Sequence, residues 1–564
     1  MAVVDWRNRF NANWISSARS QGSSVNCWAF AMTALYESMV RIEHGVWCRR
    51  SEGDLGRATG KQSWDFGNPG EASIAAERYG IADPDCMAWS EAMVLYTAKP
   101  HGAAMTAMPL SPTPDRAGRT VRLDAGPHTV LGSGVVADKK RWLNLVGPMA
   151  FMCSLPPDFT GAPPTGIFSR VTLPDVHDPG HAMLVVGFDD INQCWIIKNS
   201  WGAGWGTNGF VRVAYGQGWL EDTQWWGVRN TNPDPWTKRR QRNGVIIESG
   251  NGAAHQNREL FVRAGMGIVH DWQEAGTGPW NNAGVVRSVD EWRPIPSDAL
   301  DCPAVVQSTF NRNYELIYRS DQGQLRHIYY DQASKWWFAD AARFGPAKPR
   351  GIPGFVQGNR GAPGDFEVVV MTDTGAVEHW TKHNGSPWTN PPGTWYKRAT
   401  LTTKGTASGP ALVSSRRNLT SELEQETGEL HYVCASGSQL LHFARSSASG
   451  SWSQIAGFGG AGPYTGPCMI ETLNETGDEL EAGPLQLFVE TGNQIEHWYL
   501  PALSHWVPFP TWNQVTTFGA DVRRVIGALQ GSASLLEVYV ERTDGRYQEY
   551  TRSGINWVAG AIIP

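Results

Sequence analysis

The second half of the chain contains a repeat of about 50 residues, and this repeat restricts the possible folds more than any other feature. Each copy has an apolar strand, a tight turn and a second strand that carries histidine and an aromatic residue. The equivalent positions of the six copies are His270, His327, His379, His442, His497 and Glu549. A further apolar strand precedes each copy, as at Val245-Ile246-Ile247. The repeat therefore predicts about four short strands per copy.

The spacings between equivalent positions are 57, 52, 63, 55 and 52 residues. Four strands in a unit of this length are typical of a propeller blade, and radial closure of the blades protects strand edges that would otherwise be exposed. Each copy also has a tryptophan after its second strand, at Trp280, Trp337, Trp388, Trp452, Trp506 and Trp557. We expect an all-β propeller of six blades, with a seventh, degenerate blade as the alternative.

The sequence pattern of these blades resembles that of the bacterial and fungal propeller lectins, especially the fucose-binding types. The resemblance implies glycans, fucosylated or related, as partners, because the apolar face of a sugar stacks on aromatic side chains and weak sites gain from multivalency. It assigns no particular sugar-binding residue. The alternative is that the blade aromatics and histidines are packing groups of the core and turns.

The first half of the chain is organised around the segment from Gln21 to Gly45. Apolar residues recur at helical spacing after Cys27, and Gly45 supplies a stop. Apolar residues lie on nearly every face, so we expect a buried helix. Cys27 falls in its first turn, where free backbone N–H groups and the helix dipole stabilise a thiolate.

The residues around this cysteine, Gln-Gly-x-x-x-x-Cys-Trp-Ala-Phe, resemble the nucleophile segment of the papain-like cysteine peptidases, and Asp5-Trp6-Arg7 resembles the start of their mature chain. Two later segments complete the match. Residues 180–188 resemble the histidine strand of the family, and residues 195–206 resemble its asparagine segment. The resemblance implies an α+β fold of two lobes with a substrate cleft between them.

By this resemblance Cys27 is the nucleophile and His181 is the proton carrier that forms an ion pair with it. His177 is the other histidine in the same stretch, but His181 directly enters the apolar strand that matches the family. Asn199 is expected to orient the ring of His181, and Trp201 to cover their hydrogen bond in the substrate cleft.

Gln21 would donate a side-chain N–H to the oxyanion, with the backbone N–H of Cys27 as second donor. The segment 64–70 falls where relatives place a glycine pair beside the substrate backbone, although the pair is not clean in this chain.

These patterns predict three segments. Residues 1–228 form the peptidase domain, 229–243 form a basic linker that contains proline and asparagine, and 244–564 form the propeller. The linker, RNTNPDPWTKRRQRN, is interpreted as solvated. A processing site or a nuclear-localisation-like patch is the alternative for the same residues.

Composition excludes several other classes. The net charge of −6 gives no basic field that would suggest nucleic acid as a partner. No apolar run of 18 residues exists that could span a membrane, and the opening MAVVDWRNRF has no signal-peptide core. No metal or cofactor is expected, since CxxC and HExxH patterns are lacking. Secreted relatives carry a cysteine where this chain has Ser24, which favours a reducing compartment.

The leading hypothesis is a cysteine endopeptidase that acts on polypeptides and is targeted by a carbohydrate-binding propeller. One alternative is a lectin whose papain-like domain is mainly a scaffold. Another is a propeller that binds protein and recruits substrates for the peptidase.

Overall fold

The computed structural model divides the chain into two compact units, one of residues 1–233 and one that begins at Asp234. It describes residues 2–10, 12–61, 65–89, 112–123, 128–161, 165–170, 180–252, 256–265, 267–274, 278–287, 298–339, 343–358, 364–384, 393–401, 403–415, 429–446, 450–460, 462–472, 483–501, 511–531 and 535–563. No helix in these described ranges is long and apolar enough to cross a membrane.

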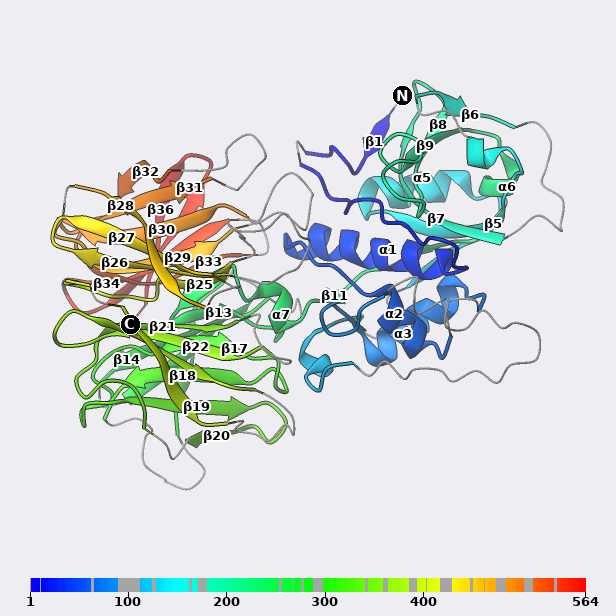
Figure 1. Ribbon diagram of the computed structural model, residues 1–564. Helices are drawn as coiled ribbons and strands as arrows, with labels where there is room; N and C mark the ends of the chain where they lie inside the picture. Colours follow the sequence, from blue (N-terminus) through cyan, green and yellow to red (C-terminus); the bar gives the residue numbers. More distant parts are fainter. Residues whose placement is uncertain are drawn as a thin grey trace. The chain divides into compact units, whose positions relative to one another are not determined.

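The first unit has a helical lobe built on α1 (Cys27–His44), with α2 (Glu52–Ala58) and α3 (Pro69–Tyr79) packed beside it (Figure 1). Helix α1 ends at Gly45, whose φ of 68° is the left-handed conformation that glycine adopts most readily. All but two of its residues are buried, because apolar side chains surround the helix. The predicted buried helix is therefore confirmed, from its first residue to its stop.

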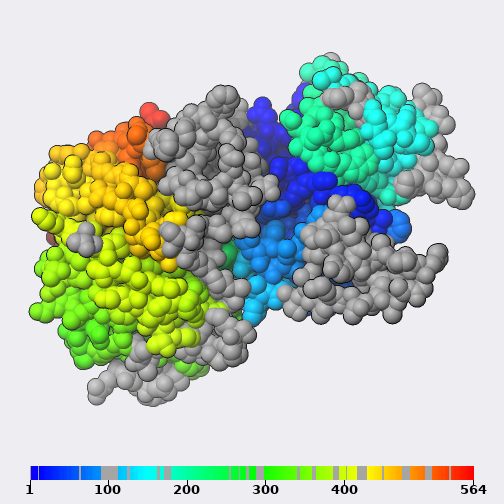
Figure 2. Space-filling view, in the orientation of Figure 1, coloured from blue at the N-terminus to red at the C-terminus, as the bar shows by residue number. Residues whose placement is uncertain are grey.

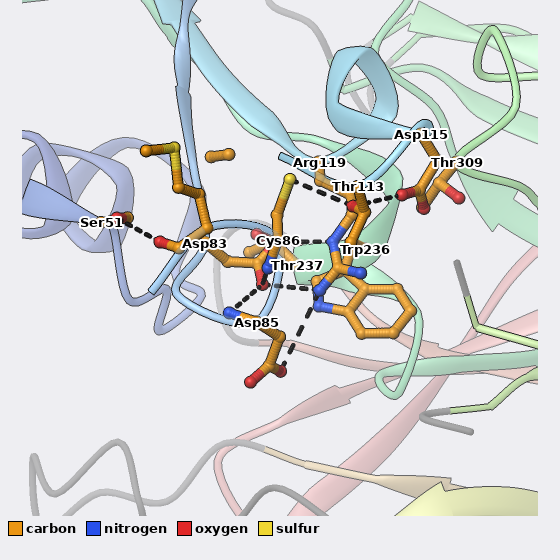
Figure 3. Close-up of polar contacts among 12 residues, drawn as sticks. Ser51, Asp83, Asp85, Cys86, Thr113, Asp115, Arg119, Trp236, Thr237 and Thr309 are labelled. Atoms are coloured by element: carbon orange, nitrogen blue, oxygen red, sulfur yellow. Dashed lines mark hydrogen bonds and ion pairs between the residues drawn. The ribbon is translucent and has the colours of Figure 1, made fainter. Parts of the chain in front are cut away.

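A buried ion pair holds the loop after β2 (Ile81–Ala82) in the helical lobe. The guanidinium of Arg119 donates to both carboxylate oxygens of Asp83, at 2.8 and 2.6 Å, and both side chains are buried. Beside it, the hydroxyl of Thr113 lies between Cys86 and Asp115 (Figure 3). This network fixes the loop because breaking a buried pair would leave an uncompensated charge.

The second lobe is an eight-stranded sheet with the order β4-β10-β5-β7-β8-β9-β6, and β1 pairs with β7. A short sheet, β11-β3-β2, belongs to the same unit. The strands are β1 (Val3–Asp5), β3 (Thr120–Leu123), β4 (Thr129–Leu131), β5 (Met149–Ser154), β6 (Ile167–Phe168), β7 (Gly180–Asp189), β8 (Cys194–Lys198), β9 (Phe210–Ala214), β10 (Trp225–Gly227) and β11 (Thr231–Asn232). The remaining short elements are α5 (Val136–Leu145), α6 (Gly218–Glu221), and the 3₁₀ turns at Arg116–Gly118 and Phe159–Gly161.

The start of the chain joins the two lobes. Strand β1 pairs with β7 of the sheet, and the chain then enters α1, which packs on β7. In Figure 2 this dark-blue segment lies between the lighter blue of the helical lobe and the cyan to green of the sheet lobe. The first residue of α1 is thereby brought to the beginning of β7.

The described residues of the second unit form six consecutive antiparallel sheets, and the sixth has one additional strand, β12 (Arg242–Gly244). The first three sheets are β13 (Ile246–Glu248), β14 (Arg258–Ala264), β15 (Gly267–Gln273), β16 (Asn281–Val285); β17 (Ala304–Gln307), β18 (Tyr314–Arg319), β19 (Leu325–Asp331), β20 (Trp336–Ala339); and β21 (Arg350–Gln357), β22 (Phe366–Met371), β23 (Val377–Lys382), β24 (Trp395–Leu401).

The last three sheets are β25 (Leu412–Ser415), β26 (Glu429–Ser436), β27 (Gln439–Arg445), β28 (Trp452–Phe458); β29 (Thr465–Glu471), β30 (Leu485–Thr491), β31 (Gln494–Leu500), β32 (Asn513–Phe518); and β33 (Val522–Gln530), β34 (Leu536–Arg542), β35 (Tyr547–Ser553), β36 (Asn556–Ile563). The second and third strands of every sheet are the strand pair predicted from the repeat. The predicted sixfold repeat of about four strands is confirmed.

The first strands of the sheets contact one another in sequence: β13 with β17, β17 with β21, β21 with β25, β25 with β29, β29 with β33, and β33 with β13. Strand β12 pairs with β33 and contacts the first strands of several sheets. Its Asn243 donates through Nδ2 to the carbonyl oxygens of Leu412 and Met469, at 2.7 and 2.9 Å.

The segment 229–243, expected as a solvated linker, is folded. It contains β11, the short helix α7 (Pro235–Lys238) and the start of β12. Its cations Lys238, Arg240 and Arg242 are buried, and Lys238 forms an ion pair of 2.5 Å with Glu248. The charges and prolines of this segment led us to expect an exposed linker. The carboxylate that neutralises Lys238 is that of Glu248, which lies outside the segment.

Candidate active site

Cys27 occupies the first turn of α1 with 4% of its surface exposed. Burial raises the pKa of its thiol, while hydrogen bonds from the backbone N–H groups of Ala182, Trp28 and Cys27 itself lower it. Two of these three donors belong to the helix N-terminus, as the sequence led us to expect. The net direction differs from the sequence expectation, because desolvation outweighs the helix terminus.

His181 lies on β7 and is oriented by a buried hydrogen bond. Its Nε2 is 2.8 Å from Oδ1 of Asn199, the residue after β8. Burial lowers the pKa of His181 to about 4, although the bond to Asn199 acts in the opposite direction. The ring of Trp201 lies over this pair, with its centroid 5.0 Å from that of His181. The imidazole of His181 is thus held in one orientation, and the ring of Trp201 shields its Nε2 from water.

The imidazole belongs to the strand that reaches the thiol, since the N–H that bonds to Cys27 is that of Ala182, the residue after His181. Burial opposes a lone charge on either group. A thiolate at Cys27 therefore requires a counter-charge beside it. An imidazole that takes the thiol proton would supply such a charge.

Ser200 connects the other two predicted residues. Its backbone N–H donates to Oδ1 of Asn199 at 2.8 Å, and its hydroxyl donates to Oε1 of Gln21 at 2.5 Å. The Gln21 amide also donates through Nε2 to the carbonyl of Ser24 at 2.7 Å. An amide nitrogen carries two hydrogens, so one N–H of Gln21 remains for a ligand.

The structure thus brings Cys27, His181, Asn199, Gln21 and Trp201 together in one unit. Sequence reasoning missed Ser200 as the residue that positions Gln21, although its place directly after Asn199 was a usable signal. It also missed a second buried thiol, Cys153, whose Sγ is 3.7 Å from the carbonyl oxygen of His181. His177 lies outside the described residues.

The loop expected to carry a glycine pair retains one glycine that the fold requires. Any side chain on Gly67 would collide with the ring of Trp28, and the indole N–H of Trp28 donates to the carbonyl of Asp65 at 3.4 Å. Phe66 stands between them with 64% of its surface exposed. The loop is therefore held against the residue that follows Cys27, while Trp64 lies outside the described residues.

All eight cysteines are free and buried. Within the part of the chain that the structure describes, no group of three or more His, Cys, Asp or Glu side chains is arranged to hold a metal ion. The chemistry that these residues can perform is nucleophilic attack by sulfur, with proton transfer by an imidazole.

Comparison with known proteins agrees with this geometry. Residues 2–224 match the model of the papain family of cysteine proteases. The N-terminal part of the chain is therefore a papain-like cysteine peptidase domain with a papain-like fold, and the enzyme class that it defines is a hydrolase.

Two curated relatives are similar over this region. Pro-cathepsin H of Mus musculus is 25% identical over 221 residues, which cover 38% of this chain and 60% of the relative. Ananain of Ananas comosus is 26% identical over 227 residues, which cover 37% and 55%. The chain thus spans little more than half the length of these relatives. A solved digestive procathepsin L 3 of Tenebrio molitor is 25% identical, with a TM-score of 0.32, and covers 41% of this chain and 70% of that chain.

Proposed function

We propose that the first unit is a cysteine endopeptidase in which Cys27 is the nucleophile and His181 the proton carrier. The buried bond of 2.8 Å between His181 and Asn199, beside a thiol at a helix N-terminus, is the observation that carries this proposal. In that arrangement the Nε2–H is committed to Asn199, and Nδ1 is the nitrogen that takes the proton of the thiol.

In the reaction that follows, the sulfur of Cys27 attacks the peptide carbonyl carbon, and the carbonyl oxygen becomes an oxyanion. The backbone N–H of Cys27 and the second N–H of Gln21 donate to that oxyanion. The imidazolium of His181 gives its proton to the departing amine, which leaves a thioester on Cys27. His181 then takes a proton from water, whose oxygen attacks the thioester and releases the acid and the thiol.

A peptidase assay with Cys27 changed to alanine tests the proposal. We expect loss of cleavage of a fluorogenic peptide and loss of labelling by the epoxide E-64. Cys153→Ala is the matched control, because it removes another buried thiol of the same unit and leaves the nucleophile. Full activity of Cys27→Ala would end the assignment.

We further propose that the six sheets of the second unit are the blades of a six-bladed propeller, which would make the two units a peptidase domain and a propeller domain. The cyclic series of contacts from β13 to β33 and back to β13 supports this, as does the pairing of β12 with β33. Completion of the last blade by a strand from the start of the unit is a way to hold such a ring closed.

Contacts between neighbouring sheets also support this closure. In the second to fifth sheets, the histidine of the third strand contacts a tryptophan that lies in the fourth strand of the next sheet or directly before it. For example, the indole N–H of Trp452 donates to Nδ1 of His379 at 3.2 Å, and that of Trp512 donates to His442 at 3.1 Å. The series returns to the first sheet where the ring of Trp280 contacts that of Tyr539 in the sixth, with the ring centroids 6.2 Å apart.

Carbohydrate binding by this unit stays a prediction without support from the comparisons. Four of the five repeat histidines are buried, and the partners of three of them are the buried or half-buried Trp395, Trp452 and Trp512 rather than exposed platforms. Trp388 and Trp506 lie outside the described residues. Retention of the whole protein on a fucosylated glycan array would favour the lectin role, and a blank array together with capture of protein substrates would favour substrate recruitment.

A further inference from the structure

A small cavity lies beneath the proposed catalytic asparagine. Its volume is about 10 Å³, and it is lined by Ala31 and Ala34 of α1, by Ala182 of β7, and by Arg19, Lys198 and Asn199. The two alanines are buried and present only methyl groups to it. About one water-sized sphere is the smallest volume that holds a water molecule.

The amide of Asn199 can be assigned from its hydrogen bonds. Both Nε2 of His181 and the backbone N–H of Ser200 approach Oδ1, at 2.8 Å each. The backbone N–H is a donor whatever the state of the ring, so the atom that it meets must be the oxygen. Rotation of the amide would set an NH₂ group against that N–H. The nitrogen Nδ2 therefore points away from His181.

That nitrogen is buried and has no hydrogen-bond partner among the described protein atoms, while Asn199 itself is 3% exposed. An unsatisfied buried amide N–H costs about 1–3 kcal/mol. The cost would fall on the residue that orients the imidazole. A partner for Nδ2 would remove this cost, and Asn199 is one of the residues that line the cavity.

We propose that one water molecule binds in this cavity, accepts a hydrogen bond from Nδ2 of Asn199 and so holds the amide in the orientation that His181 needs. The inference rests on the proposed role of Asn199 in the peptidase. It makes the water site, and the small residues that leave room for it, part of the device that positions His181.

A neutral ligand fits this site better than an anion, although two cations line it. Arg19 is paired with Glu37 at 2.8 Å and with Glu52 at 2.7 Å. Lys198 donates to the hydroxyl of Ser16, which in turn donates to Glu37 at 2.6 Å. The positive charge is therefore compensated within the same network. Water also needs two to four polar partners, and Arg19, Lys198, Asn199 and Ser200 are the polar residues that line the site.

The first test is a high-resolution crystal structure of the full chain. We expect a single density peak about 2.7–3.2 Å from Nδ2 of Asn199, with no anomalous signal in crystals grown with bromide. An empty cavity, or a bromide peak, would overturn the proposal. This measurement uses the unaltered protein, so it decides the matter even where a variant fails to fold.

The second test fills the cavity with two side chains of equal shape. Ala34→Val would displace the water with methyl groups, whereas Ala34→Thr would offer a hydroxyl in its place. We expect kcat to fall about tenfold in the valine variant, corresponding to about 1.4 kcal/mol, with KM little changed. The threonine variant should stay closer to the wild type.

The pH profile separates positioning from general loosening. In the valine variant the alkaline limb of the pH–rate profile should move to lower pH, because a less well-held Asn199 stabilises the imidazolium of His181 less. Equal profiles and rates for the two variants would refute the role of the water while the wild type remained active. Failure of the peptidase proposal is distinguishable, since it would appear as activity in Cys27→Ala.

Discussion

Replacing Asn199 with alanine tests how the site controls its imidazole. The change removes an acceptor 2.8 Å from Nε2 of His181, in a place where both residues are buried and Trp201 covers the bond. A hydrogen bond to a group that becomes charged contributes about 1.5–3 kcal/mol, which corresponds to about 10–150-fold in rate. We expect kcat/KM for a fluorogenic peptide to fall within that range.

The bond to Asn199 raises the pKa of His181, so its loss must lower that pKa. The imidazolium would then be lost at lower pH, and the alkaline limb of the rate profile should move towards acid. His181→Ala removes the proton carrier itself and should cost more, about 10²–10⁴-fold beyond the loss of orientation. Asn192→Ala, in the turn after β7, is a control that should leave the profile unchanged.

Two results would refute the reasoning. If Asn199→Ala were slower than His181→Ala, the residue that orients the ring would have been wrongly identified. If the alkaline limb of Asn199→Ala did not move, the hydrogen bond would not act on the protonation of His181. Thermal unfolding of both variants establishes that the fold is intact.

Three further predictions concern stability. Burial lowers the pKa of His181 to about 4, below its value of about 6.5 in an unfolded chain, so the unfolded state binds the proton more readily between these pH values. In Cys27→Ala the free energy of unfolding should therefore rise from pH 4 to 6.5. The additional change His181→Gln should flatten that rise. A chain that begins at residue 234 should unfold cooperatively, whereas one that begins at 245 loses Lys238 and β12 and should be less stable by at least about 3 kcal/mol, measured by urea denaturation; equal stability would refute the role of this segment. Trp452→Phe leaves Nδ1 of the buried His379 without a donor and should cost about 1–3 kcal/mol, while Trp336→Phe, 56% exposed, should change stability by less than about 0.5 kcal/mol.

Local patterns gave correct predictions where one element carries the signal. Helix α1 is apolar on almost every face and ends at Gly45, so its limits could be deduced from its own residues. The strand pairs of the second unit were equally local, since each repeats an apolar run, a turn and a histidine strand. The spacing of Cys27, His181 and Asn199 was interpretable only through resemblance to a family, because their meeting depends on the packing of α1 against β7.

The errors arose where the environment of a charge or an aromatic ring is set by distant residues. The cations of segment 229–243 are buried because Glu248 and the first strands of the sheets surround them, which no property of the segment itself predicts. The thiol pKa was expected to fall at a helix terminus, but burial by the β lobe raises it. His327 and His442 contact Trp395 and Trp512 of the next sheet, and the repeat assigned no partner to these histidines.

Both units contain a buried histidine whose Nε2 is hydrogen-bonded. The partner of the other nitrogen, Nδ1, distinguishes the structural histidine from the proposed catalytic one. In the second unit, Nε2 of His379 bonds to Glu367 at 2.7 Å and Nδ1 accepts from the indole of Trp452. An indole N–H is a donor only, so the proton of that imidazole has a fixed place and the ring acts as a link between sheets. His181 has the equivalent first bond, to Asn199, but in the proposed mechanism its other nitrogen meets a thiol that can give up a proton. Burial and an oriented Nε2 are therefore shared by structural and catalytic histidines, and only an exchangeable partner at Nδ1 turns such a histidine into a catalyst.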